Sequence, residues 1–76
     1  MNTVEVPVSP QYIGLVIGKG GENIRRIQQE SNAKVQFDTT KSDLNGNKLC
    51  IVSGMPDAVN RAVEMVKEII DMGMVI

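Results

Sequence analysis

The residues best suited to binding chemistry lie in one short glycine-rich turn. Positions 18–21 read Gly-Lys-Gly-Gly, and helix-forming sequence lies on both sides. Glycine lets a backbone adopt conformations that side chains forbid, and it lets another molecule approach the peptide groups closely. A helix beginning at Glu22 would point its free N–H groups and positive dipole end at this turn, which favours an anion. With the cation of Lys19 at its tip, the turn is predicted to contact phosphate.

The spacing of the turn excludes two common nucleotide-binding motifs. A P-loop has Ser or Thr directly after its Gly-Lys pair, but Gly20 follows Lys19 here, and no strand directly precedes the turn. The dinucleotide fingerprint needs a third glycine where Asn23 stands, and it also needs a preceding strand. We therefore expect neither nucleotide-cofactor site.

The sequence offers little material for catalysis or metal binding. It has no His and a single Cys, so zinc sites and Ser-His or Cys-His catalysis lack their usual partner. We expect no catalytic residue, no metal and no cofactor. Cys50 lies in a predicted strand, where it is expected to be a small buried hydrophobe with an inert thiol.

Length and composition indicate one small globular domain. The chain has 76 residues, of which 42% are apolar and 22% charged, and no apolar run is long enough to cross a membrane. Eight basic and nine acidic residues give a net charge of −1, so binding of a polyanion must come from local geometry. No secretory pattern opens the chain and the lone thiol requires no oxidising compartment. We expect an intracellular location, in the nucleus or the cytoplasm.

The elements before the turn are predicted from hydropathy and from proline. Alternating valines predict a strand over 3–8, and Pro7 places that strand at a sheet edge because proline cannot donate to a neighbouring strand. Ser9 as N-cap and Pro10 at the first helical position predict a short helix that ends at Ile17.

The elements after the turn begin with a helix over 22–31, which Asn32 is expected to end in a left-handed conformation. Two strands over 34–37 and 49–52 are predicted to form a hairpin across the polar segment 38–47, where Asn-Gly signals a turn. The second of them is apolar on both faces and is therefore expected to be the central strand.

A last helix is predicted to begin at Pro56 and to end at Gly73, leaving an apolar tail over 74–76. Its apolar stripe consists of Val59, Val63, Val66 and Ile70. The predicted order is β-α-α-β-β-α. This order gives one α+β domain over 3–73, with three helices packed on one face of a three-stranded antiparallel sheet.

The stretch from Ile13 to Ile27, IGLVIGKGGENIRRI, closely resembles the core of a type I KH domain. The resemblance extends from Val4 to about Met72 and includes the polar variable loop and the amphipathic last helix. The segment RIQQES at 26–31 is similar to the group of far-upstream-element-binding proteins and splicing regulators. The resemblance implies a module that binds about four nucleotides of single-stranded RNA, or of single-stranded DNA. It also implies that the module is one unit of a larger post-transcriptional regulator, acting on mRNA or splicing, with further KH domains in tandem.

The resemblance also assigns the site residues, position by position. Loop residues of KH domains contact the sugar-phosphate backbone, and the bases lie in an apolar groove. The backbone contacts are assigned to Gly18, Lys19, Gly20, Gly21 and Arg25. The base groove is assigned to Gly14, Leu15, Ile17, Ile24, Gln28, Val35, Phe37 and Lys48. Gln28 and Lys48 stand where the family often has arginines or other donors. The departure at Gln28 leaves the preferred base open.

Several of these assignments have alternatives. Ile24 and Val35 would be core residues by pattern alone, and Phe37 is expected half-buried at the groove edge. A second class of function is a KH-fold module for protein interaction or weak homodimerisation, which the near-neutral charge and the apolar tail keep open. The intact loop without acidic residues argues against it. An enzyme is a third class that no residue pattern supports, and no membrane partner is expected.

Overall fold

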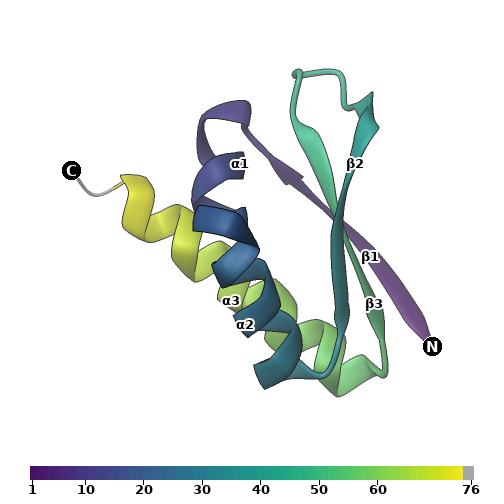
Figure 1. Ribbon diagram of the computed structural model, residues 1–76. Coiled ribbons are helices and arrows are strands. Elements are labelled where there is room, and N and C mark those ends of the chain that lie inside the picture. Colours follow the sequence, from purple (N-terminus) through teal and green to yellow (C-terminus); the bar gives the residue numbers. More distant parts are fainter. Residues whose placement is uncertain (75–76) are drawn as a thin grey trace.

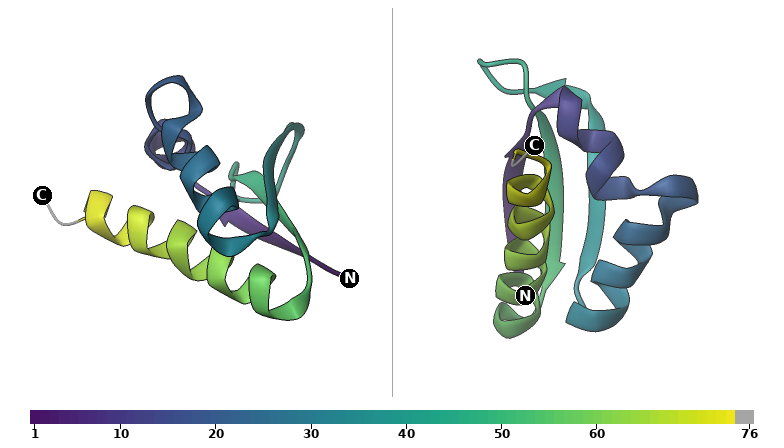
Figure 2. Two further views of the ribbon diagram at one scale, coloured as in Figure 1. Left: turned by 60° about the horizontal axis from the view of Figure 1, so that its bottom comes forward. Right: turned by 90° about the vertical axis from the view of Figure 1, so that its left-hand side faces the viewer.

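The structure, a computed structural model, describes residues 1–74, without the side chain of Thr39. The elements in chain order are β1 (Asn2–Val8), α1 (Pro10–Ile17), the 3-10 turn η1 (Lys19–Gly21), α2 (Glu22–Ser31), β2 (Lys34–Ser42), β3 (Lys48–Gly54) and α3 (Pro56–Met74). The strands form one antiparallel sheet in the order β1-β3-β2. The three helices cover the same face of this sheet (Figure 1, Figure 2). The predicted element order and α+β class are confirmed.

The core lies between the sheet and the helices. Because side chains alternate across a strand, each strand turns one set of small apolar residues toward the helices. The buried residues of the strands are Val6, Val8, Val35, Cys50 and Val52, and those of the helices include Val16, Ile27, Val59, Ala62 and Val66. Leu49 and Ile51 alternate with the buried residues of β3 and stay half-exposed on the opposite face. The central position predicted for this strand is confirmed.

Pro7 lies on the edge strand β1, as predicted. Val35 of β2 donates its N–H to Gln28 of α2, so its peptide groups turn away from β3. Val52, opposite Val35, must then bond to β1 through its partner Val4. Pro7 is three residues from Val4 and so belongs to the outward-facing set. The missing N–H of proline therefore costs no bond within the sheet.

The ends of the first two helices match the sequence signals in position. Pro10 begins α1 and Ser9 precedes it in an extended conformation, but the Ser9 side chain makes no capping hydrogen bond. Its carbonyl accepts the N–H of Tyr12 at 2.8 Å instead. Asn32 ends α2 with φ 64° and donates its N–H to the carbonyl of Gln28. The predicted left-handed stop is confirmed.

The hairpin between β2 and β3 is tighter than predicted. β2 extends beyond Phe37 to Ser42, because the polar residues resume pairing after a register shift between Asp38 and Ser42. The Asp38 carboxylate accepts both the N–H and the hydroxyl of Thr40 within this irregular stretch. The connecting turn is reduced to residues 43–47, and the Asn-Gly turn signal was correct.

The last helix differs from its prediction at Gly73, which does not end it. α3 continues to Met74, and Gly73 lies where α3 approaches α1. A Cβ at Gly73 would come within 2.6 Å of the Leu15 Cδ2 atom and 3.4 Å of the Tyr12 ring. The glycine therefore permits close helix packing. The predicted tail is wrong at Met74, and positions 75–76 lie outside the described residues. No helix within residues 1–74 combines the length and apolarity that a membrane crossing requires.

Candidate nucleic-acid interface

The glycine turn connects α1 to α2 through backbone conformations that favour glycine. Gly18, Gly20 and Gly21 have φ values of 78°, 62° and 81°. The N–H of Gly18 donates to the Gly14 carbonyl at 2.8 Å, and that of Gly21 donates to the Gly18 carbonyl at 3.1 Å. No side chain caps the start of η1 or of α2. The start of α2 is therefore uncapped, and its free N–H groups, with the partial positive charge of the helix dipole, face the turn.

Two glycines of the turn serve different purposes. A Cβ at Gly18 would lie 2.7 Å from the backbone nitrogen of Asn23, so this glycine is required by packing inside the protein. A Cβ at Gly20 would meet nothing within 4 Å, and Lys19 beside it is exposed. The tip of the turn at Lys19 and Gly20 is thus exposed, with the Lys19 carbonyl accepting the N–H of Glu22, whereas the start of the turn is closed by α2.

Two side chains of α2 hold the turn in place. Asn23 donates from Nδ2 to the Leu15 carbonyl at 2.8 Å and joins the two helices. Arg25 donates from Nη1 to the Gly20 carbonyl at 2.9 Å. A guanidinium has five N–H donors, so Arg25 keeps others available for an anion. The structure thus brings the predicted residues Lys19 and Arg25 together at the turn.

Asn23 is a site residue that the sequence analysis missed. In the sequence, this position stands out only because a dinucleotide fingerprint would have glycine there. Its sequence signal is weak, because an amide in the first turn of a helix is common and its partner Leu15 lies eight residues away. The bond becomes visible only once the turn has folded the two helices together.

Three of the predicted groove residues of the helices flank the turn on one side. A Cβ at Gly14 would meet nothing within 4 Å, so this exposed glycine leaves open space along α1. Ile17 and Ile24 are half-buried. They offer an apolar surface next to the turn that carries Lys19 and Arg25.

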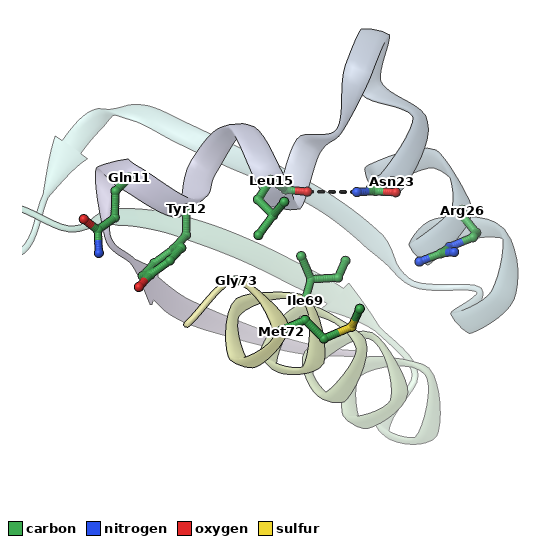
Figure 3. A pocket seen from close by; sticks show the side chains of 8 residues that line it. All are labelled: Gln11, Tyr12, Leu15, Asn23, Arg26, Ile69, Met72 and Gly73. Atoms are coloured by element: carbon green, nitrogen blue, oxygen red, sulfur yellow. Dashed lines mark hydrogen bonds between the residues drawn. The ribbon is translucent and has the colours of Figure 1, made fainter. Parts of the chain in front are cut away.

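Leu15 does not fit its predicted place in the base groove. Neighbouring residues of an α-helix are about 100° apart around its axis, so Leu15 faces away from the side that Gly14 and Ile17 share. Its side chain approaches Gly73 of α3 instead. It lines a hollow of about 880 Å³ between α1, α2 and α3, shown in Figure 3. The lining residues are Gln11, Tyr12, Leu15, Asn23, Arg26, Ile69, Met72 and Gly73.

The opposite wall of the predicted groove is the free edge of β2, which lies beside α2 (Figure 1). Val35 is buried and Phe37 half-buried, on the face that points toward the helices. Gln28 reaches across from α2 and accepts the Val35 N–H at 3.0 Å through Oε1. The structure thus brings Gln28, Val35 and Phe37 together.

Lys48 does not join this group. It begins β3 opposite Ser42, and its ammonium donates to the Ser42 hydroxyl at 2.9 Å. This hydrogen bond ties the irregular end of β2 to β3. The structure therefore gives Lys48 a role in the hairpin, and the sequence could not foresee it because the register shift that brings Ser42 opposite Lys48 has no local signal.

The charges of the site are few. Lys19 and Arg25 lie at the turn, and Glu22 stands in the first turn of α2, where a carboxylate is favourable for the helix dipole. Within residues 1–74 no His, Cys, Asp and Glu side chains gather to hold a metal ion. Burial raises the pKa of the Cys50 thiol to about 11, so this thiol is neutral and poorly reactive near neutral pH.

Comparisons with known proteins agree with this geometry. The family model for the KH domain matches residues 3–68. The human Far upstream element-binding protein 1 is 37% identical over 71 residues, which cover 93% of this chain and 11% of that protein. The polyribonucleotide nucleotidyltransferase of Chlorobaculum tepidum is 36% identical over 70 residues, which cover 92% of this chain and 8% of that protein.

Among solved structures, the 13th KH type I domain of human Vigilin has a similar fold, with a TM-score of 0.66 and 20% sequence identity. The match covers 96% of this chain and 76% of that chain. The chain spans about a tenth of the length of the curated relatives it matches.

Proposed function

The chain belongs to the KH domain family, a family of nucleic-acid-binding modules, and we propose that it binds single-stranded RNA, or single-stranded DNA, in the groove beside its glycine turn. The Gly18–Gly21 turn, with Lys19 and Arg25, contacts the sugar-phosphate backbone. The bases lie between the α1–α2 side and the free edge of β2. The groove holds about four nucleotides, as the family does.

One observation carries the backbone part of this proposal. The tip of the turn at Gly20 is exposed, and nothing lies within 4 Å of a Cβ built there. Two cations accompany it, Lys19 at the tip and Arg25 held at 2.9 Å from the Gly20 carbonyl. An exposed turn at a helix start, with two cations beside it, is suited to a phosphate.

The base part of the proposal is supported by the apolar surface next to the turn. Gly14 leaves open space along α1, and Ile17, Ile24, Val35 and Phe37 supply the walls. With two aromatic residues in the whole chain, the bases must pack mainly on aliphatic side chains. We therefore expect modest affinity from this single module.

The relatives are much longer than this chain, which favours a multi-domain context. We propose that the module acts as one unit of a larger regulator of mRNA or splicing, in the nucleus or the cytoplasm. Tandem modules on one chain gain affinity through a raised effective concentration. Tandem modules would thus bind a polyanionic ligand tightly although one domain has a net charge of −1.

The test is a fluorescence anisotropy titration of the domain with short degenerate pools of single-stranded RNA and DNA. A double variant, Lys19→Asp with Gly20→Asp, should bind at least tenfold more weakly, a loss of about 1.4 kcal/mol or more, with an unchanged circular dichroism spectrum. The matched control is Lys41→Asp with Leu44→Asp, which makes the same change of −3 in net charge at exposed positions of the β2–β3 hairpin and should leave the affinity unchanged. Equal losses in the two variants would contradict the assignment of the turn.

The salt dependence gives a second test of the same site. Because few cations lie at the turn, the plot of log affinity against log salt should have a slope of about −1 to −2 for single strands. A slope near −5 would mean that unspecific attraction, rather than the groove, holds the nucleic acid.

The hollow between α1 and α3 favours a second candidate function, a protein-interaction module. Leu15 is 44% exposed and Met72 is 74% exposed beside it, and these side chains offer an apolar surface separate from the glycine turn. A folded domain that binds neither the RNA pool nor the DNA pool would place this function first.

A further inference from the structure

Asn45 is the one asparagine of the sequence that a glycine follows. The other asparagines precede Thr3, Ile24, Ala33, Lys48 and Arg61. A peptide nitrogen can attack the side-chain amide of the asparagine before it, and a side chain on the attacking residue hinders the approach. Glycine has no Cβ and the greatest backbone freedom. The Asn45–Gly46 pair is therefore the place in the chain most open to this reaction.

Both reacting groups of this pair lie at the surface. Asn45 and Gly46 are exposed, and a Cβ built on Gly46 would meet nothing within 4 Å. Within residues 1–74 the Asn45 side chain makes no hydrogen bond, whereas the side-chain amide of Asn47 donates to the Asp43 carboxylate at 3.0 Å. The Asn45 amide can thus turn toward the Gly46 nitrogen, while the Asn47 amide is held in place.

The hydrogen bonds of the turn oppose the reaction until the turn opens. The Gly46 N–H donates to the Asp43 carbonyl at 3.1 Å, and this nitrogen must lose its proton before it can attack. The Asp43 carboxylate also accepts the N–H groups of Asn45 and Asn47 at 2.9 Å. These bonds lie at the exposed end of a hairpin, and such ends open far more often than a core does. The stability of the turn should therefore set the rate.

We propose that Asn45 is a site of spontaneous deamidation, which proceeds when the Asp43–Asn47 turn opens. The Gly46 nitrogen gives its proton to solvent and attacks Cγ of Asn45. The bond from Cγ to Nδ2 breaks, and the amide group takes up a proton and leaves as ammonia. Water then opens the resulting succinimide ring. Opening at one carbonyl gives aspartate, and opening at the other gives isoaspartate, in which the backbone runs through the side chain.

Both products disturb the turn in which they form. Each places a second carboxylate close to that of Asp43, and the two like charges repel each other. Isoaspartate also adds one backbone atom between the N–H groups of residues 45 and 46, both of which donate to Asp43. Cys50 and Val52 are fully buried in the sheet beyond the turn. The modification should therefore loosen the end of the hairpin and leave the sheet intact.

The test is peptide mapping by mass spectrometry of the folded domain after storage in a warm, mildly alkaline buffer. Exchange of NH₂ for OH adds about one mass unit, and this gain should appear in fragments that contain Asn45 but not Asn47. Asn45→Gln should abolish it, because the longer side chain must close a larger ring, whereas Asn60→Gln at an exposed position of α3 should not. No gain in the folded domain, under conditions that convert a free peptide over 41–49, would overturn the proposal.

The variant Asp43→Ala tests whether the turn sets the rate. It removes the carboxylate that accepts three hydrogen bonds, so Asn45 should react about fivefold faster or more, the effect of one lost hydrogen bond. The matched control Glu64→Ala removes an exposed carboxylate of α3 and should leave the rate unchanged. An unchanged rate in Asp43→Ala, or equal rates in both variants, would overturn the role of the turn. In NMR spectra of the stored wild-type domain, the amide of Asn47 should shift and that of Val52 should not. The reverse pattern would contradict the local effect.

Discussion

The Gly18–Gly21 turn and the Asp43–Asn47 turn are both exposed and both contain glycine of positive φ, but they satisfy their polar groups in different ways. In the turn between β2 and β3, the Asp43 carboxylate accepts the N–H groups of Asn45 and Asn47 at 2.9 Å and the Asn47 amide at 3.0 Å. In the Gly18–Gly21 turn, no side chain of the turn caps the helix start, and Arg25 holds it from outside.

The difference separates a turn that serves folding from a turn that is available to a ligand. The Asp43–Asn47 turn uses its own side chains as acceptors, so a ligand would have to displace them. The Gly18–Gly21 turn has no acceptor side chain of its own and carries Lys19. A glycine of positive φ in an exposed turn therefore says little about function until the partners of the backbone groups are known.

The largest effect expected is on stability, in the comparison of Gly18→Ala with Gly46→Ala. Both glycines have positive φ, but a Cβ at Gly18 would lie 2.7 Å from the backbone nitrogen of Asn23, whereas one at Gly46 would meet nothing within 4 Å. Urea denaturation should show a loss of about 1 kcal/mol for Gly46→Ala from backbone strain alone. Gly18→Ala should lose about 3 kcal/mol or more, because the clash adds to the strain. Equal losses would mean that Gly18 is as free of packing as Gly46.

A smaller effect is expected on binding when Arg25 is removed. Arg25→Ala loses both the clamp on the Gly20 carbonyl and a cation at the turn, so nucleic-acid affinity should fall about fivefold to tenfold, as for one charge-assisted hydrogen bond. Arg61→Ala removes an exposed cation from α3 and should leave anisotropy titrations unchanged. Equal losses of affinity in the two variants would mean that general positive charge, and not the local geometry of the turn, binds the nucleic acid.

The smallest effect is expected when the pH is lowered, and it should appear in the Asp43–Asn47 turn. Hydrogen bonds from Asn47 lower the pKa of the Asp43 carboxyl below its ordinary value of 3.8. Its stabilising contribution is therefore complete above that value and is lost as the pH falls through the lower pKa of the folded protein. In NMR spectra recorded below pH 4, the amides of Asn45 and Asn47 should shift before that of Gly20. Simultaneous shifts in both turns would indicate global unfolding instead.

The sequence predicted the parts of the fold that depend on local rules. Valine alternation and Pro7 predicted the edge strand, and Asn32 predicted the end of α2, because these signals act over a few residues. The predicted helix end at Gly73 is wrong: a glycine at a helix end is typical of a stop, but α3 continues past it. Its close approach to Leu15 depends on how two distant helices pack.

The candidate site was predictable to a similar extent. The glycine turn and its cation followed from residue types and spacing. Four features of the site could not be predicted in this way. They are the orientation of Leu15, the bond from Asn23 to the Leu15 carbonyl, the bond from Lys48 to Ser42 and the bond between Gln28 and Val35. Each depends on a pairing of elements whose register or crossing angle no short segment encodes.

The most direct measurement is an NMR titration of the isotope-labelled domain with degenerate single-stranded RNA and DNA pools. The account predicts that the largest chemical-shift changes lie in the Gly18–Gly21 turn and at Arg25, Val35 and Phe37, while the amides of the Asp43–Asn47 turn change little. Changes centred on the Asp43–Asn47 turn, or on Tyr12, Ile69 and Met72 around the hollow between α1, α2 and α3, would contradict it.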